Sequence, residues 1–575
     1  MDKRFFLALL LTGAVVIVTP LLFPRPTPVA VAVSSSTPTR QPGTLAPPSV
    51  MTGAPPATTA TTAAPTAPAA TAATGAGVPA VSADTFTLSN ELATFRFSTI
   101  GAQFLSADLP RFAQLGGREG TVQLAHGAEP MLRLRLIAGG DTVPLERLAF
   151  QVARVRGEFG ADSTRVAADG LLFRAAVGTG AISVNYTLAP DNYIARVEVR
   201  ATGLAQPAFL LIDLPSGFTS QEADTTEDAR HLAYAFKPQS GSSERVDFRK
   251  PDPGEMLLKP GPHTWAVAKS KYFLIGVLAQ QGAPAPFAEL HVTGAPRVNK
   301  VALRARATAV ATLPESGIAF ELYAGPQEWE RLVAIGRDFE NVNPYGGWIS
   351  GVVQPFATIV MRILLWMKRT LGVEYGWILV LFGVLVRLLM WPLNSRMMRT
   401  QIGMQRLAPK IQEAQNRHKG DAEKQRVAVM QVYQEAGVSP FAALSGCLPM
   451  LLPMPILIAL FFVFQNTIEF RGVSFMWLAD ISLKDPYYIL PLAMGASMFA
   501  LSWVGMRNVP PNPQTKMMAY LMPVILTIAL LNFASGLNLY YTVQNLAALP
   551  QQWLIGNERG KSAPAVAVSP KKAKK

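Results

Sequence analysis

An arginine, Arg387, lies inside the apolar run Gly376–Trp391, well short of either end. Arginine keeps its charge at every ordinary pH, and a guanidinium at the centre of a membrane helix costs about 2.5–3.5 kcal/mol on insertion scales. Two interpretations are open. The side chain either stretches to the near membrane surface, where Asn394 and Arg396 follow, or it points into a polar, hydrated site within the membrane.

Other segments of the C-terminal half are also apolar and long enough to cross a bilayer. We expect spans at Gly376–Trp391, 440–465, Tyr487–Val504, Met517–Leu531 and Gly536–Leu554. With these five crossings, the basic loop 394–439, the loop with Arg507 and Lys516 and the basic tail 557–575 all lie on one side. That distribution satisfies the positive-inside rule and places this side in the cytoplasm.

The same rule argues against a further crossing by the apolar segment 347–369, because that crossing would put loop 394–439 outside. We therefore predict that residues 344–370 form an amphipathic helix on the outer membrane surface. Its basic residues would face the lipid head groups; they are Arg362, Lys368 and Arg369.

The N-terminal region has two parts. Lys3 and Arg4 precede the apolar segment Phe5–Phe23, which is longer than the apolar region of a signal peptide. We therefore favour an uncleaved signal anchor over residues 1–23; the alternative is a signal peptide cleaved near Ala30–Ala32. Residues 24–83 are rich in Pro, Ala, Thr and Ser, which is typical of a disordered linker.

Between residues 84 and 343, short runs of alternating apolar and polar residues are separated by turn signals. The runs are Phe86–Phe97, Met131–Ile137, Ala181–Leu188 and Tyr193–Arg200. A period of two with this spacing predicts a large antiparallel β-sandwich. The stretch Pro326–Glu340 has a helical pattern and is expected to close this domain.

The composition fits a chain with membrane and soluble parts, since 50% of its residues are hydrophobic and only 16% are charged. A single cysteine, Cys447, excludes an intrachain disulfide. The five histidines are scattered, and we find no nucleotide-binding loop, nucleophile elbow or metalloprotease motif. We predict no catalytic residues, no metal site and no cofactor.

The last span carries polar residues on one helix face, because Asn538, Thr542 and Asn545 follow each other at intervals of four and three. Tyr541 lies beside them. Amides within a membrane often bond one helix to another. Alternatively, these side chains lie opposite Arg387 and line a hydrated pocket with it.

Loop 394–439 has the pattern of a helical hairpin, with helices over 397–416 and 422–435. Its apolar side chains include Met397, Met398, Met404 and Leu407. Methionine adapts to varied apolar partners, so this surface is a candidate for capturing unfolded hydrophobic segments. The alternative is a hairpin that rests on the lipid. The basic tail, with KKAKK at 571–575, is a candidate for contacting ribosomal RNA or anionic lipid.

The C-terminal half contains several short motifs: Val386–Arg387 with Trp391–Leu393, QRLAPKIQ at 405–412, Gly446–Pro449 with Met454–Ile456, DPYYILP at 485–491, Met522–Val524, and Ser535–Leu537 with Tyr540–Tyr541. Together these motifs resemble the YidC/Oxa/Alb membrane-protein insertases, of the type found in bacteria with two membranes. The likeness covers residues 345–555 closely and the sandwich loosely. The sequence departs from the usual pattern of this family at two positions, which lie in the groove that the family forms. Gly383 stands where a threonine is usual, and Pro453 stands where a glutamine is common.

The resemblance implies a core of five helices, 371–556, around a groove that opens to the cytoplasm and the lipid and carries the arginine. It implies nascent membrane proteins, the Sec translocon, the ribosome and the lipid bilayer as partners, and a chain that works as a monomer. It also implies the bacterial inner membrane, with both termini cytoplasmic and the β-supersandwich periplasmic.

We therefore predict an α+β membrane protein: an N-terminal anchor, a periplasmic antiparallel β-supersandwich, an interfacial helix and a transmembrane insertase core that folds inner-membrane proteins without nucleotide. The alternative is an envelope carbohydrate-binding or sugar-modifying protein that acts through the sandwich. That alternative needs a histidine and a carboxylate converging in a cleft, for which His231 and His263 are the candidates.

Overall fold

The structure is a computed structural model of the 575-residue chain. It describes residues 84–561, except 118, 160–165, 344, 346–348, 419, 436–453 and 508–512. The predicted anchor (1–23), the predicted linker (24–83) and the tail beyond residue 561 lie outside the described residues, as does Pro453.

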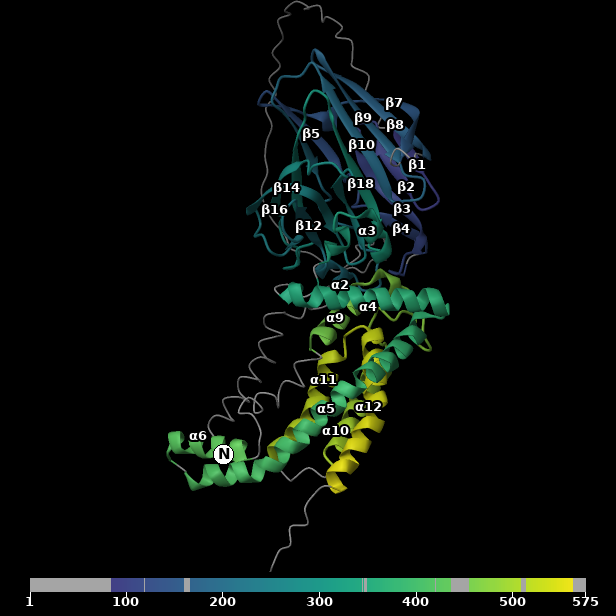
Figure 1. The fold of residues 1–575 in the computed structure, drawn as a ribbon. Coiled ribbons are helices and arrows are strands. Elements are labelled where there is room, and N and C mark those ends of the chain that lie inside the picture. The colour runs from purple at the N-terminus through teal and green to yellow at the C-terminus, as the bar shows by residue number, and fades with distance from the viewer. Residues whose placement is uncertain are drawn as a thin grey trace, which may run out of the picture. The chain divides into compact units, whose positions relative to one another are not determined.

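The first part of the described chain is a β-sandwich built from antiparallel strand pairs (Figure 1). One sheet has the order β1-β2-β3-β4, and the other has the order β6-β5-β11-β17-β16-β14-β15-β18-β10-β9-β8-β7, with β12 between β13 and β14. The strands are β1 (Thr85–Ser89), β2 (Thr94–Ser98), β3 (Phe104–Ala113), β4 (Thr121–Leu124), β5 (Arg133–Ala138), β6 (Asp141–Val143), β7 (Gln151–Phe159), β8 (Val166–Val177), β9 (Gly180–Leu188), β10 (Ile194–Thr202), β11 (Ala208–Asp213), β12 (Ala233–Pro238), β13 (Glu244–Asp247), β14 (Met256–Lys269), β15 (Phe273–Ala279), β16 (Phe287–Gly294), β17 (Ala305–Thr312) and β18 (Ile318–Pro326).

Alternation along the strands decides which side chains enter the core. In β5, Leu134, Leu136 and Ala138 are buried while Arg133 and Arg135 face outward. This is the pattern expected for a strand with one face on a core. The predicted antiparallel sandwich is confirmed, and its aromatic core includes Phe97, which stacks on Tyr186 at a centroid distance of 4.5 Å.

Two details of the predicted sandwich differ. The run Phe86–Phe97 is not one strand but the hairpin β1–β2, because the Asn90 side chain accepts hydrogen bonds from the N–H groups of Leu92 and Ala93 and turns the chain. The closing helix α3 (Trp329–Ile335) is shorter than the stretch 326–340, because Gly336 ends it with a φ of 74°. A short 3-10 helix, η2 (Phe339–Val342), follows.

The remaining described residues are mostly helical (Figure 1). The helices are α2 (Thr225–Arg230) within the sandwich, then α4 (Ser350–Leu371), α5 (Tyr375–Arg417), α6 (Ala422–Glu435), α9 (Met454–Asn466), α10 (Ile489–Gly505), α11 (Pro513–Leu530) and α12 (Ser535–Lys561). Two further 3-10 helices are η1 (Leu145–Arg147) and η4 (Ile468–Phe470). The packed pairs include α10 with α12, α5 with α12, α10 with α11, and α4 with α9.

Helix α4 is amphipathic, and it lies across the direction of α5, α10 and α12 rather than alongside them (Figure 1). Its buried face, which includes Val353, Ala357 and Leu364, packs on α9 and α5. A second stripe of apolar side chains stays exposed: Val352, Phe356, Ile359 and Trp366. Such a stripe suits a helix with one face in lipid, so placement in the membrane interface stays our prediction for this segment.

The basic residues of α4 also contact protein groups. Arg369 pairs with Glu330 of α3 at 3.1 Å, and the Arg362 guanidinium lies over the Trp329 ring at 5.9 Å. Lys368 donates to the Val373 carbonyl. The structure directs these charges to α3 and to the turn before α5, which are protein partners that the sequence pattern did not reveal.

By length and hydropathy, two helical stretches of the described residues could cross a membrane. They are Ser350–Leu371 and Tyr375–Arg396. The apolar stretches Ile489–Gly505 and Lys516–Leu530 are shorter. The predicted crossing by Gly376–Trp391 therefore rests on the N-terminal half of α5, and the predicted hairpin corresponds to the C-terminal half of α5 and to α6.

Candidate functional site

Arg387 lies on α5 where that helix packs on α12. Its Nη2 donates a hydrogen bond of 2.6 Å to Oε1 of Gln551. The Gln551 side chain is 1% exposed, and its Nε2 donates to the Trp391 carbonyl at 2.8 Å and to Ser395 Oγ at 2.7 Å. One amide on α12 therefore holds three groups of α5, one of which is the arginine.

Among the described residues, no carboxylate neutralises the charge of Arg387. The ion pairs of the described residues do not include it, and its Nε is buried without a hydrogen-bond partner. The residue is half-buried. A neutral amide orients a guanidinium but leaves its charge in place, so this position keeps a net positive potential.

Two helical turns before Gln551, a second glutamine joins the same two helices. Gln544 Nε2 donates to the Gly383 carbonyl at 3.0 Å and to the Tyr540 hydroxyl at 2.9 Å. Gly383 is buried there, and a Cβ at this position would lie 3.0 Å from Cγ1 of Val543. The absence of a side chain lets α12 approach α5 closely.

The polar residues of α12 that the sequence pattern selected form hydrogen bonds with partners other than Arg387. Asn545 Nδ2 donates to Ser497 Oγ of α10 at 3.1 Å. Asn538 is fully buried and donates to the Leu530 carbonyl at 3.2 Å, and Thr542 donates to the Asn538 carbonyl at 2.7 Å. Tyr541 is partly buried beside the Tyr540 ring.

Helix α12 thus has two polar faces. Gln544 and Gln551, seven residues apart, face α5 and Arg387, whereas Asn545 faces α10. Sequence reasoning selected the second face and missed the two glutamines. Their seven-residue spacing, two helical turns, was the signal that could have revealed them.

The predicted capture surface is only partly described. The side chains of Met397 and Met404 lie outside the described residues, and Met398 and Leu407 are half-buried. On α6, Val427 and Met430 are exposed. The turn between α5 and α6 is fixed by Asp421, whose carboxylate accepts from the N–H groups of Glu423 and Lys424.

The two histidines considered for sugar chemistry are packed inside the sandwich. His263 is fully buried against Phe236, with Nε2 3.1 Å from the Lys259 carbonyl. His231 Nε2 lies 3.3 Å from Glu227 Oε1, one turn away on α2. Burial lowers the pKa of both imidazoles. Neither histidine lines the two cavities that the structure shows in the sandwich.

Comparison with known proteins divides the chain in the same way as the fold. Residues 85–359 match the family model described as the YidC periplasmic domain, and residues 366–562 match the model described as the 60Kd inner membrane protein. A membrane protein insertase YidC of Anaeromyxobacter dehalogenans strain 2CP-C is 31% identical over 418 residues, which cover 69% of this chain and 71% of that protein.

A second relative, from Anaeromyxobacter sp. strain Fw109-5, has the same name and is 34% identical over 319 residues. That alignment spans about half of each protein, 54% of both. Among solved structures, an active YidC insertase with its first transmembrane domain resolved aligns with 81% of this chain and 91% of its own, at 18% identity and a TM-score of 0.32.

Proposed function

Because this chain belongs to the YidC family of membrane protein insertases, we propose that it inserts integral proteins into the inner membrane through a hydrophilic groove that Arg387 makes cationic. The family joins an inner-membrane part to a periplasmic domain. The observation that supports the role of Arg387 is its bond to the neutral amide of Gln551 rather than to a carboxylate.

The physical role of such a charge is to lower the barrier for a polar segment. A charged segment that enters hydrocarbon loses its hydration. A half-buried guanidinium of uncompensated charge attracts acidic side chains more strongly than it would in water, because the surrounding dielectric is lower. Arg387 would therefore favour substrates whose exported segment carries Asp or Glu. No nucleotide is needed, because apolar burial of the substrate's own helix drives the reaction.

The other parts of the chain would serve this reaction. We propose that the substrate helix leaves between α9 and α12, that the hairpin of α5 and α6 captures it first through Met397, Met398, Met404 and Leu407, and that the basic tail aids docking of ribosomes. Asn538, Tyr541, Thr542 and Asn545 would line the groove. We further propose an N-terminal anchor, cytoplasmic termini, action as a monomer alone or beside the Sec translocon, and no catalysed reaction.

The test replaces Arg387 in the full-length protein and measures insertion into vesicles of two substrates that differ only in the charge of the exported segment. Arg387→Ala should impair the acidic substrate by about tenfold, the effect of losing roughly 1.4 kcal/mol, and spare the neutral one. Arg387→Lys should retain most activity.

A matched control is Arg96→Ala, because this arginine is exposed on the sandwich and pairs with Asp108. Insertion should be unchanged in that variant. If both Arg387 variants insert the acidic substrate at the wild-type rate, the proposed role of the charge is wrong.

Deleting residues 84–325 distinguishes the sugar-directed alternative from the insertase. An envelope enzyme that acts through the sandwich would lose all activity, whereas an insertase should largely persist on its helical half. The fully buried position of His263 and the contact of half-buried His231 with Glu227 favour the insertase.

A further inference from the structure

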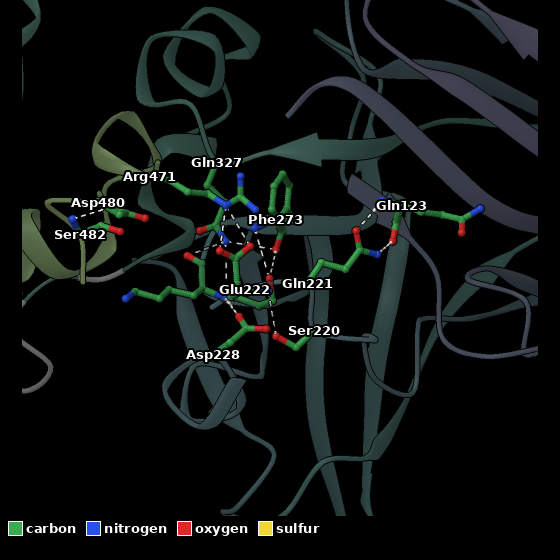
Figure 2. A network of polar contacts seen from close by, with 12 residues as sticks. Gln123, Ser220, Gln221, Glu222, Asp228, Phe273, Gln327, Arg471, Asp480 and Ser482 are labelled. Carbon is green, nitrogen blue, oxygen red and sulfur yellow. Dashed lines mark hydrogen bonds and ion pairs between the residues drawn. The ribbon is translucent and has the colours of Figure 1, made fainter. Parts of the chain in front are cut away.

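A buried ion pair joins the sandwich to the loop that connects α9 with α10. Arg471 Nε donates to both carboxylate oxygens of Glu222, at 2.9 and 2.8 Å, and the two side chains are 3% and 8% exposed. The guanidinium also lies over the Phe273 ring at 5.4 Å. Figure 2 shows the Arg471 side chain extending toward Glu222, with Phe273 beside the pair.

Hydrogen bonds within the sandwich fix the chain around Glu222. The preceding residue, Gln221, exchanges side-chain hydrogen bonds with the backbone of Gln123 in β4 (Figure 2). The Gln221 carbonyl also accepts from the Leu115 N–H. Close by, buried Asp228 accepts from the Lys271 N–H at 3.0 Å. These bonds attach the chain next to Glu222 to the sandwich, so the pair links Arg471 to the sandwich.

A second contact brings the same parts together. The Glu469 carboxylate accepts a hydrogen bond of 3.2 Å from the N–H of Trp329, at the start of α3. Within the sandwich, Gln327 fixes the residues just before α3, because it donates to the carbonyls of Ser270 and Phe273 and accepts from Asn343. The loop that connects α9 with α10 is thus attached to the sandwich at two points, Glu469 and Arg471.

The same loop sets the first residues of the two helices behind the groove. The Ser535 N–H donates to the Leu483 carbonyl at 2.7 Å, and the Gly536 N–H donates to the Ile481 carbonyl at 2.9 Å, where α12 begins. Fully buried Asp485 accepts from the Leu490 N–H at 2.7 Å, at the start of α10. A displacement of the loop therefore displaces the beginning of α12.

From these contacts we infer that Glu222 and Arg471 are positioning residues for the groove: the periplasmic domain, through this pair, holds the 471–485 loop and so fixes where Gln551 of α12 meets Arg387. The inference rests on the proposed function, because the groove is part of that proposal. Its structural part, that the pair fixes the beginning of α12, is measurable separately.

The energetics of a buried pair distinguish this role from simple stabilisation. Removing one partner leaves a buried, uncompensated charge, which is strongly destabilising, whereas replacing both by apolar residues of similar volume is often neutral. Deleting the whole sandwich also leaves Arg471 without Glu222, but in water, where no desolvation cost remains. Loss of Glu222 alone should therefore disturb the core more than loss of residues 84–325.

The experiment measures backbone hydrogen exchange and insertion for the full-length protein in lipid nanodiscs. In Glu222→Ala, the segment around Ser535 and Gly536 should exchange at least about tenfold faster, as expected for loss of a buried ionic partner, while strands β14 and β15 exchange as in the wild type. Insertion should fall in parallel. Glu222→Gln, which keeps the side-chain shape, should show a smaller effect of the same kind and serves if the alanine variant does not fold.

A double variant in which both partners of the ion pair are replaced provides the decisive comparison. Glu222→Leu combined with Arg471→Met should return both exchange at α12 and insertion to within about twofold of the wild type. Asp252→Ala is the matched control, because Asp252 pairs with Arg297 on the exposed surface of the same domain; neither readout should change.

Wild-type exchange at Ser535 and Gly536 in both Glu222 variants would overturn the inference, and so would faster exchange confined to the sandwich. These outcomes leave the proposed function standing, since that depends on Arg387. Conversely, normal insertion by both Arg387 variants would remove the proposed role of the charge and leave the exchange result intact.

Discussion

Arg387 of α5 and Gln551 of α12 meet through a hydrogen bond of 2.6 Å, so that a permanent cation is held by a neutral amide. The amide is nearly inaccessible, and it also binds the Trp391 carbonyl and Ser395. This arrangement orients the guanidinium without cancelling its charge. It also explains how the chain carries an arginine within an apolar helix without a carboxylate partner among the described residues.

Replacing Gln551 separates the charge of the site from its geometry. In Gln551→Glu, a carboxylate takes the place of the amide and neutralises Arg387, so insertion of substrates with acidic exported segments should fall as far as in Arg387→Ala. In Gln551→Leu, the positive charge remains but its orientation is lost, so insertion should fall less than in Gln551→Glu, at some loss of thermal stability. Both variants lose the bond to the Trp391 carbonyl, whereas the Ser395 hydroxyl can still donate to the glutamate. Equal insertion by the two variants in the vesicle assay would contradict a role for charge.

Gly383 tests how closely α5 and α12 pack. Gly383→Thr would introduce the residue that is usual at this position of the family, but its Cβ would lie 3.0 Å from Val543 Cγ1. Overpacking of this kind costs about 1–3 kcal/mol. We expect a lower thermal midpoint in detergent, and recovery of that midpoint when Val543→Ala is added. A threonine variant as stable as the wild type would show that α12 moves away freely.

The hydrogen bonds made by the asparagines of α12 are expected to contribute little to stability. Asn545→Leu breaks the bond to Ser497, and hydrogen bonds between membrane helices contribute about 0.6 kcal/mol on average and about 1.7 kcal/mol at most. Unfolding measurements should show a loss in this range, and Ser497→Ala should add little in the double variant. Replacing both Asn538 and Asn545 by leucine also tests whether they support Arg387. Normal insertion by that variant would remove this idea.

Because the carboxyl group of Glu469 is buried, we predict that the stability of the protein depends on pH. Burial, together with Glu328 and Glu330, raises the pKa of its carboxyl to about 7 from the ordinary value of 4.5. The folded state then binds more protons than the unfolded state between these values, so stability should fall as the pH rises through this window, by about 3 kcal/mol at most. Thermal midpoints at pH 5 and pH 8 should differ more for the wild type than for Glu469→Gln. Parallel curves for the two proteins would contradict the prediction.

The amino-acid sequence by itself determined the sandwich, the helical half and the presence of an arginine within an apolar helix. These follow from local patterns: alternation in strands such as β5, long apolar runs, and the charges of the loops between them. Such patterns depend on which face of one element is buried, and neighbouring residues in the chain encode that information.

Only the tertiary structure decided which polar side chains meet. Asn538, Thr542 and Asn545 share a face by sequence, but the rotation of α12 between α5 and α10 turns Gln544 and Gln551 toward Gly383 and Arg387 instead. Glu222 and Arg471 are separated by 249 positions and still form a buried pair. Contacts of this kind depend on how separate elements pack, and packing is set jointly by many side chains, so no local pattern encodes it.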